Sequence, residues 1–169
     1  MKKPSNTTPH EQRLEQWIHL YSDILFKVCF MNLSDRSLAE DALQDTFLKA
    51  WKSLDRFEAS SPVNERAWLC RIAINTCRDY QRSKWFRHID LRRELNDLAP
   101  NPSPLDPADT ALFEDICQLP SKLKHVLILY YYQDMTLREI ATILNLSLGT
   151  VHHRLKKAES LLKLSLEGD

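Results

Sequence analysis

The feature that most constrains this chain is a series of amphipathic helical patterns with almost no glycine. Apolar residues recur every three or four positions over residues of about 11–31, 37–54 and 63–86, and the same spacing returns beyond residue 110. Such spacing is typical of helices that bury one face. The 169 residues contain only 2 glycines, which argues against β-architectures built on tight turns and against glycine-rich phosphate-binding loops. The sequence therefore predicts an all-α protein.

A proline-rich stretch divides the helical patterns into two groups. The periodicity is lost between about residues 87 and 110, where four of the eight prolines lie: Pro100, Pro102, Pro104 and Pro107. Proline removes a backbone donor and clashes with the preceding helical turn, so this stretch is expected to be an extended linker. We therefore predict two small helical domains, residues 11–86 and 111–166, joined by linker 87–110.

Shorter breaks separate the helices expected in the first domain. Ser34 or Asp35 is suited to cap the second helix, whose buried face is expected to include Trp51. Residues 55–62 are predicted to form a polar loop. Its last two residues, Ser61 and Pro62, have the order of an N-cap followed by a proline in the first helical turn.

The charges of the chain are balanced in total but unevenly distributed. There are 23 basic and 23 acidic residues, yet residues 66–93 hold eight basic side chains against two acidic ones. Residues 35–58 hold six acidic side chains against four basic ones. This asymmetry indicates an anionic partner for one surface and a different partner for another.

Cysteine spacing and hydropathy exclude several classes of protein. The four cysteines show no CxxC spacing, so buried thiols are expected, and no metal or cofactor site is predicted. No apolar run reaches the 18 residues of a membrane span, and residues 1–8 lack the apolar stretch of a signal peptide. We therefore expect a cytoplasmic chain without membrane insertion.

Residues 136–158 have the pattern of a helix-turn-helix. Thr136 and Glu139 form a capping box for the first helix, and Ser147 can cap the second helix after the turn at 145–147. The solvent face of the second helix carries Thr150, His152, His153, Arg154, Lys156 and Lys157. These side chains suit phosphates and base edges when such a helix lies in the major groove. The alternative is a solvated basic face on an ordinary helical hairpin.

Two longer segments on either side of the linker add a family resemblance. Residues 39–51, AEDALQDTFLKAW, and 67–82, AWLCRIAINTCRDYQR, resemble the polymerase-binding and minus-ten segments of extracytoplasmic-function (ECF) sigma factors of the sigma-70 family. Residues 119–163 resemble region 4 of the same family, which reads the minus-thirty-five element. The resemblance runs from about residue 17 to 164.

The resemblance implies a role for each surface. It implies that Asp41, Gln44, Asp45 and Leu48 bind core RNA polymerase. It implies that the minus-ten DNA is contacted by Arg56, Phe57, Arg71, Asn75, Arg78 and Arg82, with Asn75 and residues 55–61 around a flipped base. For Phe57 the sequence favours neither of two locations, the DNA pocket or the core of the domain. The six solvent-face residues of the second helix at 150–157 would read the minus-thirty-five DNA.

The implied protein is an alternative sigma factor that directs promoter recognition, DNA melting and transcription initiation. It would catalyse no reaction itself and would need no cofactor. Its partners would be core RNA polymerase, promoter DNA and an anti-sigma factor, which could hold it at the membrane. Because His152 and His153 replace the basic residue and serine common in the family, minus-thirty-five binding is expected to strengthen as the pH falls through the imidazole range.

Two other classes of protein remain as alternatives. A stand-alone helix-turn-helix regulator would bind promoter duplex without polymerase, but it leaves the acidic helix and the helix bearing Asn75 unexplained. A helical enzyme has no support from an HExxH motif, a nucleophile motif or a glycine-rich loop.

Overall fold

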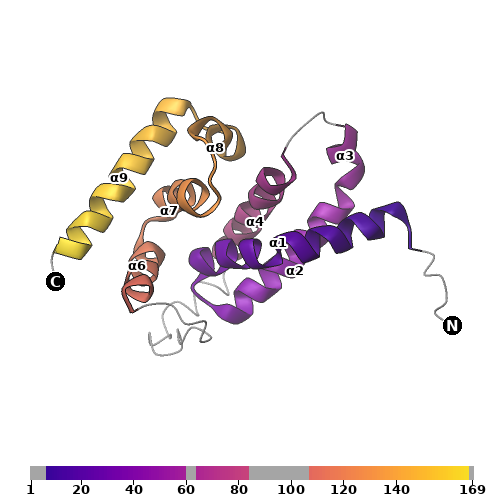
Figure 1. The fold of residues 1–169 in the computed structure, drawn as a ribbon, viewed down its shortest axis with the longest axis horizontal. Coiled ribbons are helices and arrows are strands. Elements are labelled where there is room, and N and C mark those ends of the chain that lie inside the picture. The colour runs from indigo at the N-terminus through magenta and orange to yellow at the C-terminus, as the bar shows by residue number, and fades with distance from the viewer. Residues whose placement is uncertain (1–6, 60–63, 84–106, 168–169) are drawn as a thin grey trace.

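The structure, a computed structural model, describes residues 7–59, 64–83 and 107–167, and its regular elements there are all helical. The first group consists of α1 (Pro9–Leu33), α2 (Arg36–Lys52), α3 (Leu54–Ala59) and α4 (Glu65–Arg82). The second group consists of α6 (Pro107–Gln118), α7 (Ser121–Leu127), the π-helical turn η2 (Ile128–Tyr132), α8 (Leu137–Leu144) and α9 (Leu148–Glu167). Figure 1 shows the two groups side by side, with α4 facing α8. The predicted all-α fold is confirmed.

Helices α1, α2 and α4 pack against one another as a bundle. Helix α1 begins with a capping box between Thr8 and Glu11. Asp35 caps α2 by accepting a hydrogen bond from the backbone N–H of Leu38 at 2.8 Å, which decides between the two predicted caps. The faces that meet carry small side chains at Ala39, Ala42, Ala50, Ala67 and Ala73, all buried. Small residues at these contacts let the helix backbones approach closely.

The bundle differs from the sequence prediction in three places. Residues Leu54–Ala59 form the short helix α3, because Leu54 and Phe57 lie one turn apart and both are buried. The prediction of a polar loop was therefore wrong for this segment. The predicted cap at residues 61–62 lies outside the described residues, and α4 is capped by Asn64, which accepts from the backbone N–H of Arg66. Trp51 was expected in the core but is 43% exposed.

Three cysteines lie buried where α1 meets α4: Cys29, Cys70 and Cys77. Burial raises the pKa of the Cys70 thiol to about 12. A hydrogen bond with Cys29, and then burial, raise the pKa of Cys77. The Cys70 and Cys77 thiols therefore stay protonated, as expected for small core residues. In the described part of the chain, no group of His, Cys, Asp and Glu is arranged to hold a metal ion.

Helices α8 and α9 form the predicted helix-turn-helix. Thr136 and Glu139 make the capping box, and Asn145 ends α8 in the left-handed conformation with φ of 53°. Ser147 then accepts a hydrogen bond from the backbone N–H of Thr150 at the start of α9. The buried anchors are Ile140, Val151, Leu155 and Ala158. No helix among the described residues is both long and apolar enough to cross a membrane.

The two groups of helices contact each other directly. Helix α1 contacts α6 and α7, and α4 contacts α8. Phe30 of α1 stacks on Phe113 of α6, with 5.4 Å between the ring centroids. Helix α6 begins at Pro107, inside the predicted linker, and residues 87–106 of that linker lie outside the described residues. The division into two domains stays a prediction.

Candidate functional site

The outward face of α2 combines acidic, amide and apolar side chains. Asp41 and Gln44 are exposed, and Leu48 is 50% exposed. Trp51 lies one turn beyond Leu48 on the same face, so the exposed apolar strip is longer than the sequence predicted. The sequence predicted that Trp51 is buried, because its neighbours Ala50 and Leu54 belong to the core face. The same position also fits the edge of the exposed face, and the structure places Trp51 there. Asp45, the fourth predicted polymerase-binding residue, is only partly exposed.

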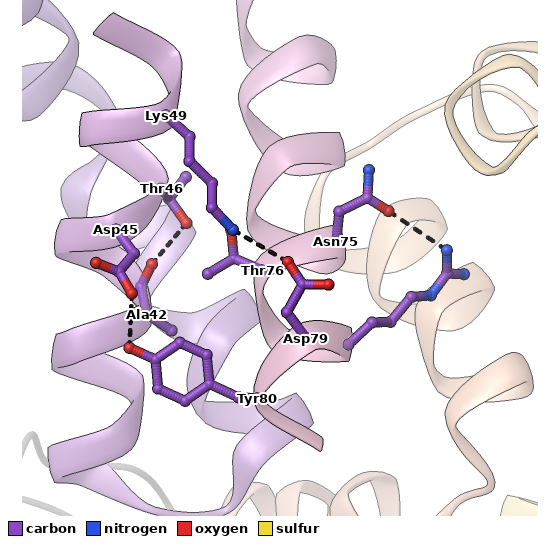
Figure 2. Close-up of polar contacts among 9 residues, drawn as sticks. Ala42, Asp45, Thr46, Lys49, Asn75, Thr76, Asp79 and Tyr80 are labelled. Atoms are coloured by element: carbon purple, nitrogen blue, oxygen red, sulfur yellow. Dashed lines mark hydrogen bonds and ion pairs between the residues drawn. The ribbon is translucent and has the colours of Figure 1, made fainter. Parts of the chain in front are cut away.

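Asp45 is partly exposed because it also attaches α2 to α4. Tyr80 donates its hydroxyl proton to Asp45 Oδ2 at 2.7 Å. Burial, followed by the hydrogen bond and charge of Asp45, raises the pKa of Tyr80, which stays protonated as the donor. Lys49 adds a second cross-link, with Nζ 3.2 Å from Thr76 Oγ1 and 3.1 Å from Asp79 Oδ2. Figure 2 shows these contacts running from α2 to α4, so the two helices form one unit.

The exposed face of α4 carries a polar and basic stripe formed by Arg71, Asn75, Arg78 and Arg82. These positions are four, three and four residues apart, so they lie along one side of the helix. Arg71, Asn75 and Arg82 are exposed, whereas Arg78 is half-buried. Arg78 donates to Asn75 Oδ1 at 3.4 Å, a long contact that leaves both amide N–H groups of Asn75 for another partner. The stripe brings together four of the six residues predicted for minus-ten DNA.

The other two predicted minus-ten residues lie on α3 and have different surroundings. Arg56 is exposed. Phe57 is only 8% exposed: its ring stacks on Trp68 with centroids 4.5 Å apart and meets the edge of Trp17 at 6.0 Å. The structure therefore places Phe57 in the core of the bundle, where its ring has no free face for a base.

Helix α9 displays its predicted DNA-binding residues to different degrees. His152, His153, Lys156 and Lys157 are exposed, and Thr150 and Arg154 are half-buried. The Thr150 hydroxyl lies 2.8 Å from that of Ser147 as part of the helix cap. Lys156 pairs with Glu159 at 3.3 Å, and Tyr131 donates to the same carboxylate, which lowers the pKa of Glu159. Of the six predicted DNA-binding residues on α9, His152, His153 and Lys157 are exposed and have no such pairing with any described residue.

A histidine that the sequence gave no reason to select lies between the two groups of helices. His125 of α7 is 2% exposed, and its Nδ1 is 3.4 Å from a guanidinium nitrogen of Arg78. Burial, and then the nearby charges of Arg78, Lys124 and Arg154, lower the pKa of His125 to about 3. The imidazole is therefore neutral at neutral pH, with Nδ1 as the acceptor toward Arg78. The burial of His125 and its contact with Arg78 are seen only in the folded chain, so no local pattern in the sequence indicates them.

Comparison with known proteins assigns both groups of helices. The sigma-70 region 2 family matches residues 17–87, and the sigma-70 region 4 family matches residues 114–162. RNA polymerase sigma factor CnrH of Cupriavidus metallidurans is 32% identical over 143 residues, which cover 77% of this chain and 74% of CnrH. The chain is an ECF sigma factor of the sigma-70 family. Such proteins direct transcription initiation by RNA polymerase, and the resemblance seen in the sequence is confirmed.

Other relatives of this sigma factor agree in sequence or in fold. ECF sigma factor SigW of Bacillus subtilis is 27% identical over 88% of this chain and 86% of SigW. The match to the probable sigma factor RfaY of Xanthomonas campestris is 33% identical over 78% of this chain, but it spans only 35% of RfaY. The structure of sigma factor RpoE of Bartonella quintana, solved with anti-sigma factor NepR, superposes with a TM-score of 0.77 at 23% identity, covering 94% of this chain and 99% of that chain.

Proposed function

We propose that this sigma factor joins core RNA polymerase to a promoter through three surfaces of its own. The observation that carries the proposal is the cross-linking of α2 to α4 by the Tyr80–Asp45 and Lys49–Asp79 contacts. The outward face of α2 is suited to a protein partner, and the stripe of α4 is suited to DNA. Because the two helices form one unit, a polymerase bound to α2 would hold the α4 stripe at a fixed position relative to itself.

The polymerase-binding surface is proposed to consist of Asp41, Gln44, Asp45 and Leu48, extended by Trp51. A basic helical partner would complement the two carboxylates, which favours correct orientation and fast association. Leu48 and Trp51 would supply the apolar area, since both are about half exposed in the chain alone. Buried aromatic side chains at the centre of an interface commonly contribute most of its binding energy.

The minus-ten surface is proposed to be the α4 stripe together with Arg56 of α3. Arg71 and Arg82 are exposed and suit phosphates, whose neutralisation dominates affinity for DNA. Asn75 can both donate and accept hydrogen bonds, which suits the pairing edge of an unpaired base. Phe57 is left out of this surface because it is buried.

The minus-thirty-five surface is proposed to be the exposed face of α9. This face carries Thr150, His152, His153, Arg154, Lys156 and Lys157. The capped start of α9 positions the first of these residues at the end of the helix that enters the major groove. We assign residues 11–86 and 111–166 to the two functional domains of the chain.

We further propose that an anti-sigma factor controls this protein and that the protein acts by binding, without catalysing a reaction. RpoE and CnrH, which share its fold, have structures in complex with the anti-sigma factor NepR and with the cytosolic domain of CnrY, respectively. The proposed partners place the working protein in the cytoplasm, where RNA polymerase and promoter DNA are found.

Run-off transcription from the promoter upstream of the gene tests the proposal, with core polymerase in the presence and absence of the chain. The key variant is Leu48→Arg, and the matched control is Ile18→Arg, which changes an apolar residue on α1 that is also exposed, at 43% against 50% for Leu48. We expect transcription to require the chain, and Leu48→Arg to weaken polymerase binding by about thirtyfold, as for a central interface residue. Ile18→Arg should behave as wild type. Tight binding of promoter duplex by the chain alone, with no polymerase-dependent transcription, would favour a stand-alone regulator instead.

A further inference from the structure

The first two turns of α1 attach that helix to both α3 and α4. His10 Nε2 lies 3.4 Å from Oδ1 of Asp55 on α3. Arg13 donates from a terminal guanidinium nitrogen to Oε1 of Glu65, the first residue of α4. The match to the sigma-70 region 2 family begins at residue 17, so His10 and Arg13 precede the matched segment. These two contacts therefore come from a part of α1 to which the family match gives no role.

Glu65 is held by two side chains of α1. While Arg13 pairs with Oε1, Tyr21 donates its hydroxyl proton to Oε2 at 3.4 Å. Burial, and then the charge of Glu65, raise the pKa of Tyr21, so the phenol stays protonated as the donor. A carboxylate in the first turn of a helix also interacts favourably with the helix dipole. Glu65 thus fixes the beginning of α4 against α1.

Arg13 also contacts the aromatic side chains that join α1 to α3 and α4. Its guanidinium carbon lies 5.7 Å from the centroid of the Trp17 ring, a distance at which a cation is attracted to the face of the ring. Trp17 in turn contacts Phe57 of α3 and Trp68 of α4, with ring centroids 6.0 and 5.5 Å apart. One arginine therefore acts on all three helices, directly or through Trp17.

The contact of Arg13 with Glu65 joins residues 52 positions apart in the chain. Arg13 Nε is buried and makes no hydrogen bond with any described residue, so Glu65 compensates a partly desolvated charge. The two side chains are still 39% and 29% exposed, and pairs of such exposure contribute little to overall stability. We therefore expect loss of the contact to let the beginning of α4 shift against α1 without unfolding the bundle.

The elements held in this way carry residues of the proposed minus-ten surface. Arg56 of α3 lies between Asp55 and Phe57, both of which contact α1. The α4 stripe begins at Arg71, fewer than two helical turns after Glu65. A shift of α3 relative to α4 would therefore change the spacing between Arg56 and the stripe.

We propose that Arg13 is a positioning residue for minus-ten recognition, which with Glu65 keeps Arg56 of α3 and Asn75 of α4 at a fixed spacing along one DNA strand. The proposal rests on the proposed function of α3 and α4 in binding minus-ten DNA. Contacts with bases carry the sequence information, and binding groups must be held within about 0.5 Å to act together. Loss of the Arg13–Glu65 contact would therefore reduce sequence discrimination more than overall affinity.

The test measures how well the holoenzyme distinguishes two fluorescent single-stranded oligonucleotides. One carries the minus-ten element of the upstream promoter, and the other has the same bases in scrambled order. The measured quantity is the ratio of the two dissociation constants. Partial unfolding lowers the concentration of active protein for both oligonucleotides alike, and loss of a simple phosphate contact weakens both alike. A displaced α3 or α4 changes the ratio, so this measurement separates positioning from stability.

The variants differ in what they leave at the Arg13 site. Arg13→Gln removes the charge, whereas Arg13→Lys keeps a cation next to Glu65 and Trp17. The matched control is Arg36→Gln, which removes an arginine from an ion pair with Glu40 that lies within α2 and joins no two helices. Far-UV circular dichroism verifies that each variant is folded, and titration with core polymerase measures its affinity for that partner.

We expect Arg13→Gln to lower the discrimination ratio by about fivefold, with unchanged polymerase affinity. Arg13→Lys should stay within about twofold of wild type, because the lysine still pairs with Glu65. Arg13→Gln combined with Glu65→Gln should lose no more than Arg13→Gln alone, since either change removes the pair. A wild-type ratio in folded Arg13→Gln would overturn the proposal, and so would an equal loss in Arg36→Gln.

A separate arm distinguishes failure of this proposal from failure of the proposed function. Asn75→Ala changes the α4 stripe without touching Arg13 or Glu65. If Asn75→Ala discriminates as wild type does, the proposed minus-ten surface is wrong and the role of Arg13 falls with it. If Asn75→Ala loses discrimination while Arg13→Gln keeps it, only the role of Arg13 is wrong.

Discussion

His125 makes the stability of this sigma factor depend on pH in a predictable direction. The histidine is buried against Arg78 of α4, Lys124 of α7 and Arg154 of α9, and its pKa falls to about 3 in the folded chain. In the unfolded chain its pKa would be about 6.5. Between these values the unfolded state binds a proton that the folded state does not, so stability rises with pH. The contribution is fully present above about pH 6.5 and is lost progressively as the pH falls toward about 3.

The size of the effect follows from how far the pH lies below the pKa of His125 in the unfolded chain. Each pH unit corresponds to about 1.4 kcal/mol, so a fall to pH 5.0 costs about 2 kcal/mol for one histidine. His125→Gln is the perturbation that isolates this cost. Glutamine keeps a side-chain acceptor for Arg78 but does not titrate, and the remaining histidines are shared with wild type, so their contributions cancel in the comparison.

The assay is urea unfolding of both proteins at pH 7.5 and pH 5.0. We expect the wild-type chain to lose about 2 kcal/mol more than His125→Gln between the two conditions. The glutamine variant is expected to be less stable at pH 7.5, because the amide does not fill the imidazole site. Equal losses in the two proteins would refute the reasoning, since they would mean that His125 is protonated in the folded chain at pH 5.0 without cost.

Three further predictions concern single contacts. Phe57→Ala should destabilise the chain by about 3–5 kcal/mol in urea unfolding, and Phe57→Leu by much less; an unchanged stability would contradict the buried ring. Thr136→Ala should cost about 1 kcal/mol through loss of the α8 cap, with Thr136→Ser close to wild type, and equal losses in both variants would count against capping. Tyr80→Phe should cost about 1–2 kcal/mol because it removes the hydroxyl that donates to Asp45, and the loss should be smaller when Asp45→Asn is already present.

Local sequence signals predicted the long helices and the helix-turn-helix. The caps at Asp35, Thr136 and Ser147 were each visible in the sequence, because a cap depends on residues only three positions apart. Helix α3 was missed because a helix of six residues contains too few apolar positions for a period to be recognised. Trp51 was wrongly predicted to be buried because its position lies on the boundary between the buried and the exposed face of α2.

The candidate site was predictable where it lies on one helix and unpredictable where helices meet. The α4 stripe and the α9 face follow from helical spacing, and most of their residues are exposed as that spacing requires. For Phe57 the sequence did not decide between the core and the DNA pocket. The ring is buried through contacts with Trp17 of α1 and Trp68 of α4. His125 carries no sequence signal, since its surroundings depend on a contact with an arginine 47 positions away.

The hydroxyl of Tyr80 restricts which mutations the proposed polymerase-binding surface can accept. Asp45 serves both as a carboxylate toward solvent and as the acceptor that attaches α4 to α2. Under the proposed function, a mutation at Asp45 would therefore alter two phenotypes together: the affinity for polymerase and the position of the α4 residues proposed to contact the promoter. A suppressor screen started from such a mutant should recover second-site changes at Tyr80, Lys49 or Asp79, within the same chain, as well as changes in the polymerase. Asp41 and Gln44 make no such attachment to another described helix, so mutations there should yield suppressors in the polymerase alone.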